Sequence, residues 1–276
     1  MSLVPDQASF RQLAQTSDLI PVCLDMMADL ETPVSVYARL RALGSPFLFE
    51  SVTGGERIGR YSFCGAAPAM TVTAWEDRTE IIHRDGKKET IPTPKDPLTL
   101  VKKELSGLRV AKVPGLPPFV GGMVGMVSYE YIHRVEPTVP QPAKDPAGTP
   151  ILHFMLVDRV VAFDNASQKL RLIVNARVSS PAQADVAWEA ARKELEALRT
   201  VVTGPRAAIA AELPAISAPV IASKSCFLDG PTSPSKATRS TSIACCVMST
   251  RRPTCSSWKL AEASTSWAPL PKSTSA

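Results

Sequence analysis

Apolar side chains recur along residues 6–200 in two patterns, which predict a chain of short helices and short strands. Apolar positions three or four residues apart are typical of one helix face, and alternating or continuous apolar runs are typical of strands. The helical pattern predicts helices at 6–15, 33–43, 98–108 and 181–198. The second of these is expected to be capped by Thr32 and ended by Gly44. The strand pattern predicts strands at 20–26, 47–52, 60–65, 70–75, 80–84, 87–91, 151–163 and 169–178.

Turn residues between these strands predict hairpins. The segments 53–56 (Thr-Gly-Gly-Glu), 85–86 (Asp-Gly) and 164–165 (Asp-Asn) each separate two predicted strands, and such residues favour tight turns. The run 151–163 is interpreted as one long strand interrupted at residues 158–159, and the prolines of 137–150 predict a surface loop before it. Strands joined by tight turns pair antiparallel, so the predicted fold class is α+β, with antiparallel sheet layers and flanking helices.

The predicted body carries no familiar catalytic motif. The sequence has no Walker loop, no nucleophile elbow and no histidine pair at metal-binding spacing. The histidines, His83, His133 and His153, are scattered, and we interpret each as a surface or core residue rather than a ligand. The glycines of segment 121–125 lack the GxGxxG spacing of a phosphate-binding turn, so we interpret them as positions of close backbone packing.

Charge, cysteine and proline divide the chain into two regions. The formal net charge is +5, and residues 222–276 carry seven Lys and Arg against two Asp and Glu. The same residues contain four of the six cysteines, twenty Ser and Thr and five prolines. Without a secretion signal or paired CxxC motifs, these cysteines predict neither a disulfide framework nor a zinc site. We therefore predict a folded domain at 1–213 and a low-complexity, disordered tail at 214–276.

The same features limit the compartment and the partners. No stretch approaches the roughly 18 uncharged apolar residues that a membrane helix needs. Residues 1–6 lack the basic region and apolar run that begin a signal peptide, so we expect a cytoplasmic protein that binds no membrane. Lys and Arg are dispersed along the tail, with only Arg251 and Arg252 adjacent, which does not favour a nucleic-acid partner.

One predicted strand end suggests a ligand site. The run 47–51 (Phe-Leu-Phe-Glu-Ser) places a carboxylate, Glu50, and a hydroxyl, Ser51, at the end of an apolar strand. Adjacent strand residues face opposite ways, so both could contact one ligand only if the chain bends there. A carboxylate can receive an ammonium group and apolar side chains can hold a ring, which suits an amino acid. The alternative is that both residues simply begin a solvated turn.

Several motifs follow one another along the body in a characteristic order. They are Pro-Val-Ser-Val-Tyr at 33–37, Leu-Phe-Glu-Ser-Val at 48–52, Gly-Glu-Arg-Ile-Gly-Arg-Tyr-Ser-Phe at 55–63, Pro-Phe-Val-Gly-Gly-Met-Val-Gly at 118–125, Ser-Tyr-Glu at 128–130, and the segment 154–164. Together they closely resemble the N-terminal region of anthranilate synthase component I, a chorismate-utilising enzyme family. The resemblance covers roughly residues 18–200 and implies the N-terminal part of that family's fold.

The resemblance implies a role in the first committed step of tryptophan biosynthesis. In that family the complete chain is a lyase that binds chorismate and Mg²⁺, adds ammonia and eliminates pyruvate to form anthranilate. A glutamine amidotransferase subunit, component II, usually supplies the ammonia. The family's Leu-Leu-Glu-Ser motif contacts the feedback inhibitor L-tryptophan, and it matches residues 48–51 with one change, Phe49. The resemblance thus assigns tryptophan binding to Glu50 and Ser51.

The resemblance also implies that this chain is catalytically incomplete. The family's chorismate and magnesium residues belong to its larger C-terminal region, and no signature of that region follows Leu213. We therefore assign no catalytic and no metal residue and expect the chain to bind no cofactor. Read in another frame with suitable codons, the stretch from Ser240 yields strings similar to the start of the chorismate-binding domain, which favours a frameshifted tail over an authentic one. A domain without its partner region is expected to expose apolar segments such as 119–127 and to aggregate or remain partly unfolded.

Two other functions stay open at the level of the sequence. Aminodeoxychorismate synthase component I, an enzyme of the folate pathway, shares this N-terminal layout. The close matches at 55–63 and 118–125 favour anthranilate synthase over it. A non-enzymatic tryptophan-binding regulatory module is the other alternative, and it requires that the body folds alone and that tryptophan protects it against heating.

Overall fold

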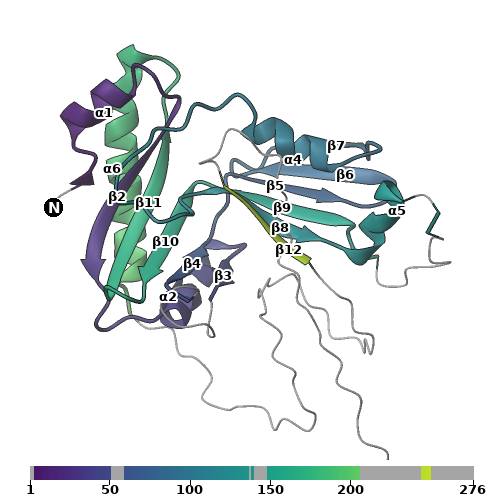
Figure 1. Cartoon of the computed structure of the whole chain (residues 1–276), viewed down its shortest axis with the longest axis horizontal. Helices are drawn as coiled ribbons and strands as arrows, with labels where there is room; N and C mark the ends of the chain where they lie inside the picture. Colours follow the sequence, from purple (N-terminus) through teal and green to yellow (C-terminus); the bar gives the residue numbers. More distant parts are fainter. Residues whose placement is uncertain (1–2, 51–58, 137, 140–147, 206–243, 250–276) are drawn as a thin grey trace, which may run out of the picture.

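The computed structural model describes residues 3–50, 59–136, 138–139, 148–205 and 244–249, which form two antiparallel sheets and several helices (Figure 1). Sheet A has the strand order β1 (Leu3–Val4), β2 (Leu19–Met27), β11 (Lys169–Arg177), β10 (Arg159–Asp164), β4 (Tyr61–Gly65) and β3 (Phe47–Phe49). Sheet B has the strand order β12 (Ala244–Ser249), β8 (Gly122–Val127), β9 (Leu152–Val157), β5 (Met70–Ala74), β6 (Arg78–His83) and β7 (Lys88–Pro92). The helices are α1 (Gln7–Leu13), α2 (Pro33–Leu40), α4 (Leu98–Leu105), α5 (Ile132–Val135) and α6 (Ala184–Val202), with 3₁₀ turns at Arg41–Leu43, Tyr129–Tyr131 and Pro181–Gln183. The predicted α+β class is confirmed.

The predicted hairpins are confirmed where the structure describes them. β6 pairs with β7 across the turn at Asp85 and Gly86, and Gly86 has a φ of 87°, which favours glycine. β10 pairs with β11 from Arg159 opposite Val174 to Asp164 opposite Lys169. β3 pairs with β4, although the strand predicted at 47–52 ends its pairing at Phe49.

The helix after β2 begins where the sequence predicts, and the 3₁₀ turn that continues it beyond Leu40 ends at the predicted glycine. Thr32 Oγ1 accepts a hydrogen bond from Ser35 N at 3.1 Å, and Ser35 Oγ accepts one from Thr32 N at 3.0 Å. This reciprocal cap satisfies two amide donors that the helix itself leaves unbonded. Gly44 ends the following 3₁₀ turn with a φ of 83°, so the chain can reverse direction into β3.

Three helices cover one face of sheet A. Figure 1 shows α1 and α6 alongside β2 and β11, and α2 beside β4. Alternate residues of the strands point to these helices: Val22 and Leu24 from β2, and Leu170 and Leu172 from β11, are buried in one cluster with Leu195 of α6. Apolar side chains at every second position of the strands therefore pack against the apolar face of the helices in a single layer.

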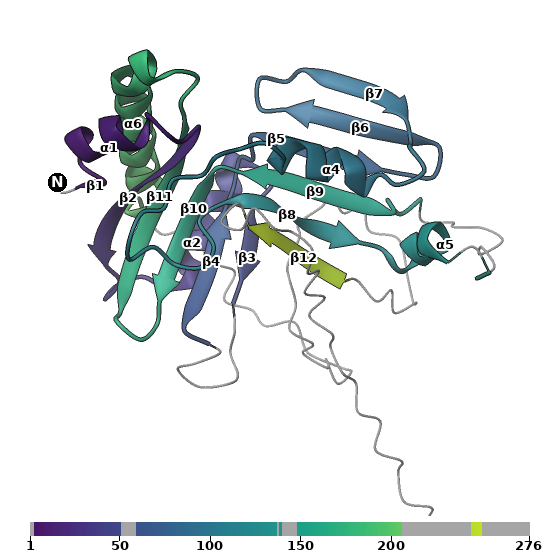
Figure 2. The ribbon, with the colours of Figure 1, turned by 45° about the horizontal axis from the view of Figure 1, so that its top comes forward.

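Helix α4 covers one face of sheet B. In Figure 2, α4 lies across β5 and β9. Leu98 and Val101 lie one turn apart on α4 and are buried against Met123, Leu152 and Phe154 of the sheet. The other residues of α4 include lysines in its last turn, so its outer face is charged.

The interruption predicted at residues 158–159 is confirmed, but the two parts are not one strand, because the segment crosses there from one sheet to the other. β9 ends at Val157 in sheet B and β10 begins at Arg159 in sheet A. Between them, the Asp158 carbonyl accepts hydrogen bonds from Asn175 N at 2.9 Å and Asn175 Nδ2 at 3.2 Å. Most of both strands is buried on both faces, so the apolar run continues through the crossing and hides it.

A second apolar cluster joins the two sheets. It consists of Cys23, Phe47, Val113, Leu116, Phe119, Val120, Val124, Met155, Val157, Val160, Ala162 and Ile173. The expectation that segment 119–127 is exposed is therefore wrong: Phe119 is 5% exposed, and Met123 and Val124 are fully buried. Phe119 and Val124 belong to this cluster between the sheets, and Met123 packs on the α4 side of sheet B.

Several predictions fall on residues that the structure does not describe. These are the turn at 53–56, most of the proline-rich loop at 137–150, and the tail at 214–276 apart from β12. At residues 244–249 the tail forms a strand, which the expectation of a disordered tail did not include. Among the described residues, no helix has both the length and the apolar character needed to cross a membrane.

Candidate functional site

The structure places one of the two predicted site residues. β3 pairs with β4 through Phe47 opposite Gly65, Leu48 opposite Cys64 and Phe49 opposite Phe63. Glu50 is the first residue after this pairing, and it is exposed. Ser51 lies outside the described residues. The paired part of β3 thus ends directly before the carboxylate that the sequence predicts as a ligand-binding group.

The charge of Glu50 affects the pKa of the buried Cys64 thiol on the neighbouring strand. Cys64 is fully buried in β4. Burial raises the pKa of the Cys64 thiol, and the negative charge of Glu50 raises it further. Cys64 is therefore a protonated core residue rather than a nucleophile, and the Glu50 carboxylate is the charged group of this strand end.

Aromatic side chains lie on the face of sheet A that the helices leave uncovered, and Phe49, the residue before Glu50, is one of them. Directly opposed residues of neighbouring strands share a face, and one such row runs from Phe49 through Phe63 and Ala162 to Arg171 and Asp25. Phe49 and Phe63 are half-buried against the cluster that joins the sheets.

The rings in this region contact one another. The Phe63 and Phe119 rings meet edge to face with centroids 5.5 Å apart, and the Tyr61 and Phe63 rings are stacked at 6.0 Å. The Arg60 guanidinium lies 4.9 Å from the centroid of the Tyr61 ring. We call Phe49, Tyr61 and Phe63 the aromatic face. Half-buried rings with a cation at their edge can hold a planar ring of a ligand.

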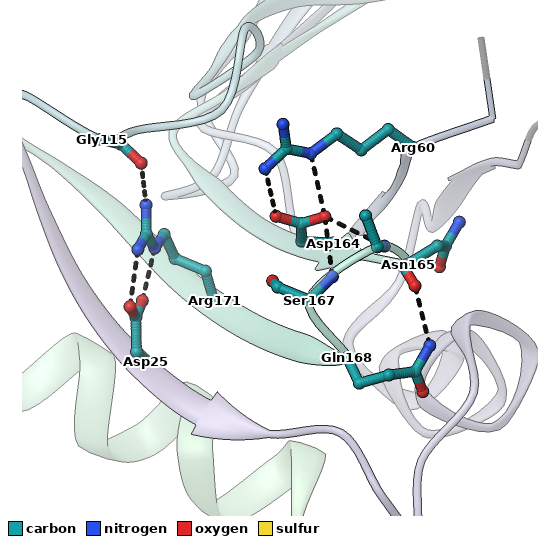
Figure 3. Close-up of polar contacts among 9 residues, drawn as sticks. Asp25, Arg60, Gly115, Asp164, Asn165, Ser167, Gln168 and Arg171 are labelled. Atoms are coloured by element: carbon teal, nitrogen blue, oxygen red, sulfur yellow. Dashed lines mark hydrogen bonds and ion pairs between the residues drawn. The ribbon is translucent and has the colours of Figure 1, made fainter. Parts of the chain in front are cut away.

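An ion pair holds the start of β4 to the end of β10 beside the aromatic face (Figure 3). Arg60 Nε and Nη2 donate to the two oxygens of Asp164 at 3.1 Å and 2.9 Å. The Arg60 guanidinium, together with the hydroxyl and backbone of Ser167, lowers the pKa of Asp164 to about 2. Asp164 is therefore a carboxylate at neutral pH, and Arg60 is oriented by it.

A second ion pair lies on the same face of the sheet (Figure 3). Arg171 Nη2 donates to Asp25 Oδ2 at 2.6 Å, Arg171 Nε pairs with the other oxygen, and Nη1 donates to the Gly115 carbonyl. Arg171 therefore joins two strands of sheet A to the linker that precedes β8. In both pairs the arginine donates two hydrogen bonds to one carboxylate, which holds Arg60 and Arg171 in fixed positions on this face of sheet A.

The sequence analysis missed these two ion pairs. Arg60 and Asp164 are separated by 104 residues, and Asp25 and Arg171 by 146 residues. One signal was available: Asp25 and Arg171 interrupt apolar positions of strands predicted to be buried, which suggests that each has a charged partner. Sequence spacing alone could not identify that partner.

Two of the histidines contact neighbouring oxygen atoms. Burial lowers the pKa of His153, and its Nδ1 lies 2.8 Å from Thr73 Oγ1. His133 Nδ1 lies 3.1 Å from the Val139 carbonyl. Within the part of the chain that the structure describes, no group of three or more His, Cys, Asp or Glu side chains could hold a metal ion.

The described side chains in this region offer charged and aromatic groups to a small molecule. They include an exposed carboxylate, Glu50, half-buried rings and two arginines oriented by aspartates. The nearby thiol of Cys64 is buried and protonated. An amino acid with a ring has the ammonium group and the planar surface that these groups complement.

Comparisons with known proteins identify the family to which this chain is similar. A family model described as chorismate binding enzyme matches residues 44–220. Anthranilate synthase component 1 of Acetivibrio thermocellus is 35% identical over 167 residues, which are 60% of this chain and 33% of that protein. Anthranilate synthase component 1 of a Synechocystis species is 39% identical over 174 residues, or 62% of this chain and 34% of that protein. The crystal structure of anthranilate synthase component I from Streptococcus pneumoniae is 22% identical with a TM-score of 0.41, covering 65% of this chain and 37% of that one. The chain spans about a third of the length of the two curated relatives.

Proposed function

Because the chain belongs to the chorismate binding enzyme family, we propose that it is the N-terminal part of an anthranilate synthase component I. The observation that carries the proposal is the combination of the family match over residues 44–220 with relatives of that name at 35% and 39% identity. The names of both relatives support the tryptophan pathway over the folate pathway. In the complete enzyme, chorismate and ammonia would give anthranilate and pyruvate.

We propose that this chain does not carry out that reaction alone. The matches reach only a third of the two relatives' length, and the described residues supply no cluster of ligands for Mg²⁺. We assign neither magnesium nor chorismate to residues of this chain. The glutamine amidotransferase subunit is proposed as the partner of the complete enzyme.

A direct assay tests the proposed function. The full chain is incubated with chorismate, Mg²⁺ and ammonium, and anthranilate is measured by its fluorescence. The Acetivibrio thermocellus relative serves as the active control. We expect anthranilate from the control and none from this chain. Formation of anthranilate by this chain would contradict the proposal, because the catalytic groups would then lie within the present sequence.

We further propose that Glu50 and Ser51 form part of a tryptophan site. Glu50 is exposed at the point where the pairing of β3 ends, and Phe49, the residue before it, belongs to the aromatic face, so a bend of the chain at this point would let both contact one ligand. In this proposal the Glu50 carboxylate receives the ammonium group of L-tryptophan, Ser51 donates to or accepts from its polar groups, and the rings of Phe49 and Phe63 contact the indole.

Thermal protection tests the tryptophan site. At a ligand concentration 100 times the Kd, binding should stabilise the chain by about 2.7 kcal/mol, which raises the melting temperature by roughly 5–10 °C for a domain of this size. Glu50→Gln should remove the shift. Glu89→Gln serves as a matched control, because Glu89 is an exposed carboxylate on β7 at the far edge of sheet B. An unchanged shift in Glu50→Gln would exclude Glu50 from the site.

A further inference from the structure

The outer edges of the two sheets differ in how they are protected against pairing with another chain. Native edge strands are usually short, or carry charges or proline, because unpaired amide and carbonyl groups otherwise invite another strand. β7, at one edge of sheet B, is exposed and carries Lys88, Glu89 and Pro92. At the edges of sheet A, β1 has two residues followed by Pro5, and β3 has three residues.

β8 has none of these protective features. Its six residues, Gly122–Val127, read Gly-Met-Val-Gly-Met-Val and include no charge and no proline. The first four of them are buried. One side of β8 pairs with β9 along its whole length, from Gly122 opposite Val157 to Val127 opposite Leu152. By composition, β8 is an interior strand that requires a neighbour on its other side as well.

The neighbour on that other side comes from a distant part of the chain. β12 pairs with β8 antiparallel over all six residues, from Ala244 opposite Val127 to Ser249 opposite Gly122. β12 is the last strand of sheet B, so β8 is its one partner among the described strands. Figure 2 shows β12 lying along β8 on the side away from β9.

We propose that β12 is a removable cover for the β8 edge, and that the uncovered edge pairs with β8 of a second copy of the chain. A second copy fits this edge for two reasons. Two identical β8 strands related by a twofold axis can pair antiparallel and satisfy the same backbone groups that β12 satisfies. β8 also lacks any charged side chain that would repel its own copy across the pair. The inference does not depend on the proposed function.

The pairing of β12 with β8 is tested by a cysteine bridge. Met126 is directly opposite Cys245, and opposed residues of antiparallel strands have Cα separations within the range that a disulfide spans. Under mild oxidation, Met126→Cys in the full chain should form a bridge to Cys245 within one molecule, identified by peptide mapping. The matched control combines Met126→Cys with Cys245→Ser and should lose that bridge. If the thiol introduced at position 126 bridges instead to another tail cysteine, the register on which the proposal rests is overturned.

Removal of the cover is tested with proline. Neighbouring strand residues direct their amides to opposite sides, so the double variant Cys245→Pro and Cys246→Pro must lose at least one β12 amide that faces β8. Ser256→Pro and Ser257→Pro form the matched control in the same tail. In reducing buffer, sedimentation velocity should give the mass of one chain for the wild type and the control, and twice that mass for the β12 variant.

A charge on β8 should reverse the self-association. Met126 is half-buried, so Met126→Lys can place a charge on the edge as natural edge strands do. Added to the β12 proline variant, it should restore the mass of one chain. A proline variant that stays monomeric, or one that loses the cooperative melting of the wild type, would overturn the proposal, because β12 would then be either irrelevant to the edge or an essential part of the fold.

Discussion

Replacing Gly125 by alanine is expected to destabilise the protein by about 3 kcal/mol or more. A Cβ atom at this position would overlap the carbonyl oxygen of His153 and would lie 2.6 Å from Phe154 Cα. Both atoms belong to the backbone of β9, which is held on its other side by β5. The backbone therefore cannot move away from the new methyl group without disturbing the pairing on both sides of β9.

Thermal unfolding measures this effect. For a domain of this size, a loss of about 3 kcal/mol lowers the melting temperature by roughly 10 °C. Gly86→Ala is a suitable control, because a Cβ atom there meets nothing within 4 Å but must adopt a φ of 87°. That backbone conformation alone costs about 1–2 kcal/mol, so the control should melt between the wild type and Gly125→Ala. A Gly125→Ala variant as stable as the wild type would mean that β8 and β9 are farther apart than in the structure.

The sequence predicts Gly125 as a position of close packing, but it does not predict which backbone approaches it. The same limit applies to every contact between distant segments. Hairpins such as β6–β7 and β10–β11 are predictable because their turn residues, Asp85-Gly86 and Asp164-Asn165, act locally. The cap of α2 is predictable for the same reason, since Thr32 and Ser35 are three residues apart.

The crossing at Asp158 shows where periodicity fails. A strand buried on both faces has no alternation, so the pattern cannot indicate that β9 and β10 belong to different sheets. The burial of segment 119–127 has the same origin. Its apolar residues could cover a partner or fill a core, and only the position of sheet A relative to sheet B decides that they fill a core.

The candidate site also has one part that the sequence predicts and another that it does not. Glu50 and its strand end follow from local sequence and from the family resemblance, and the structure places Glu50 at the end of β3 as expected. The aromatic face and the pairs Arg60–Asp164 and Arg171–Asp25 depend on the order of strands in sheet A. That order joins residues more than 100 positions apart, and no local pattern encodes it.

A second large effect is expected at Arg39, which holds two helices together on the covered face of sheet A. The Arg39 side chain is 5% exposed. Nη1 donates to Glu31 Oε2 at 2.6 Å and to the Val202 carbonyl at 2.8 Å, and Nη2 donates to Glu31 Oε1 at 3.0 Å. One side chain therefore joins the start of α2 to the end of α6.

Arg39→Met is expected to cost about 3 kcal/mol, because it removes one partner of a largely buried ion pair and leaves the Glu31 carboxylate in place. Denaturant unfolding measures the loss. Arg199→Met is the matched control: the Arg199 and Glu196 side chains are 44% and 50% exposed, and such surface pairs contribute at most about 1 kcal/mol.

The double variant Arg39→Met with Glu31→Gln distinguishes a charge effect from a packing effect. If the cost of Arg39→Met comes mainly from the carboxylate left behind, neutralising Glu31 should recover part of the stability, so the two substitutions together cost less than their sum. Additive losses would mean that the stem of Arg39 stabilises the protein by filling space between α2 and α6. In that case the ion pair would orient the two helices without contributing measurably to the free energy of unfolding.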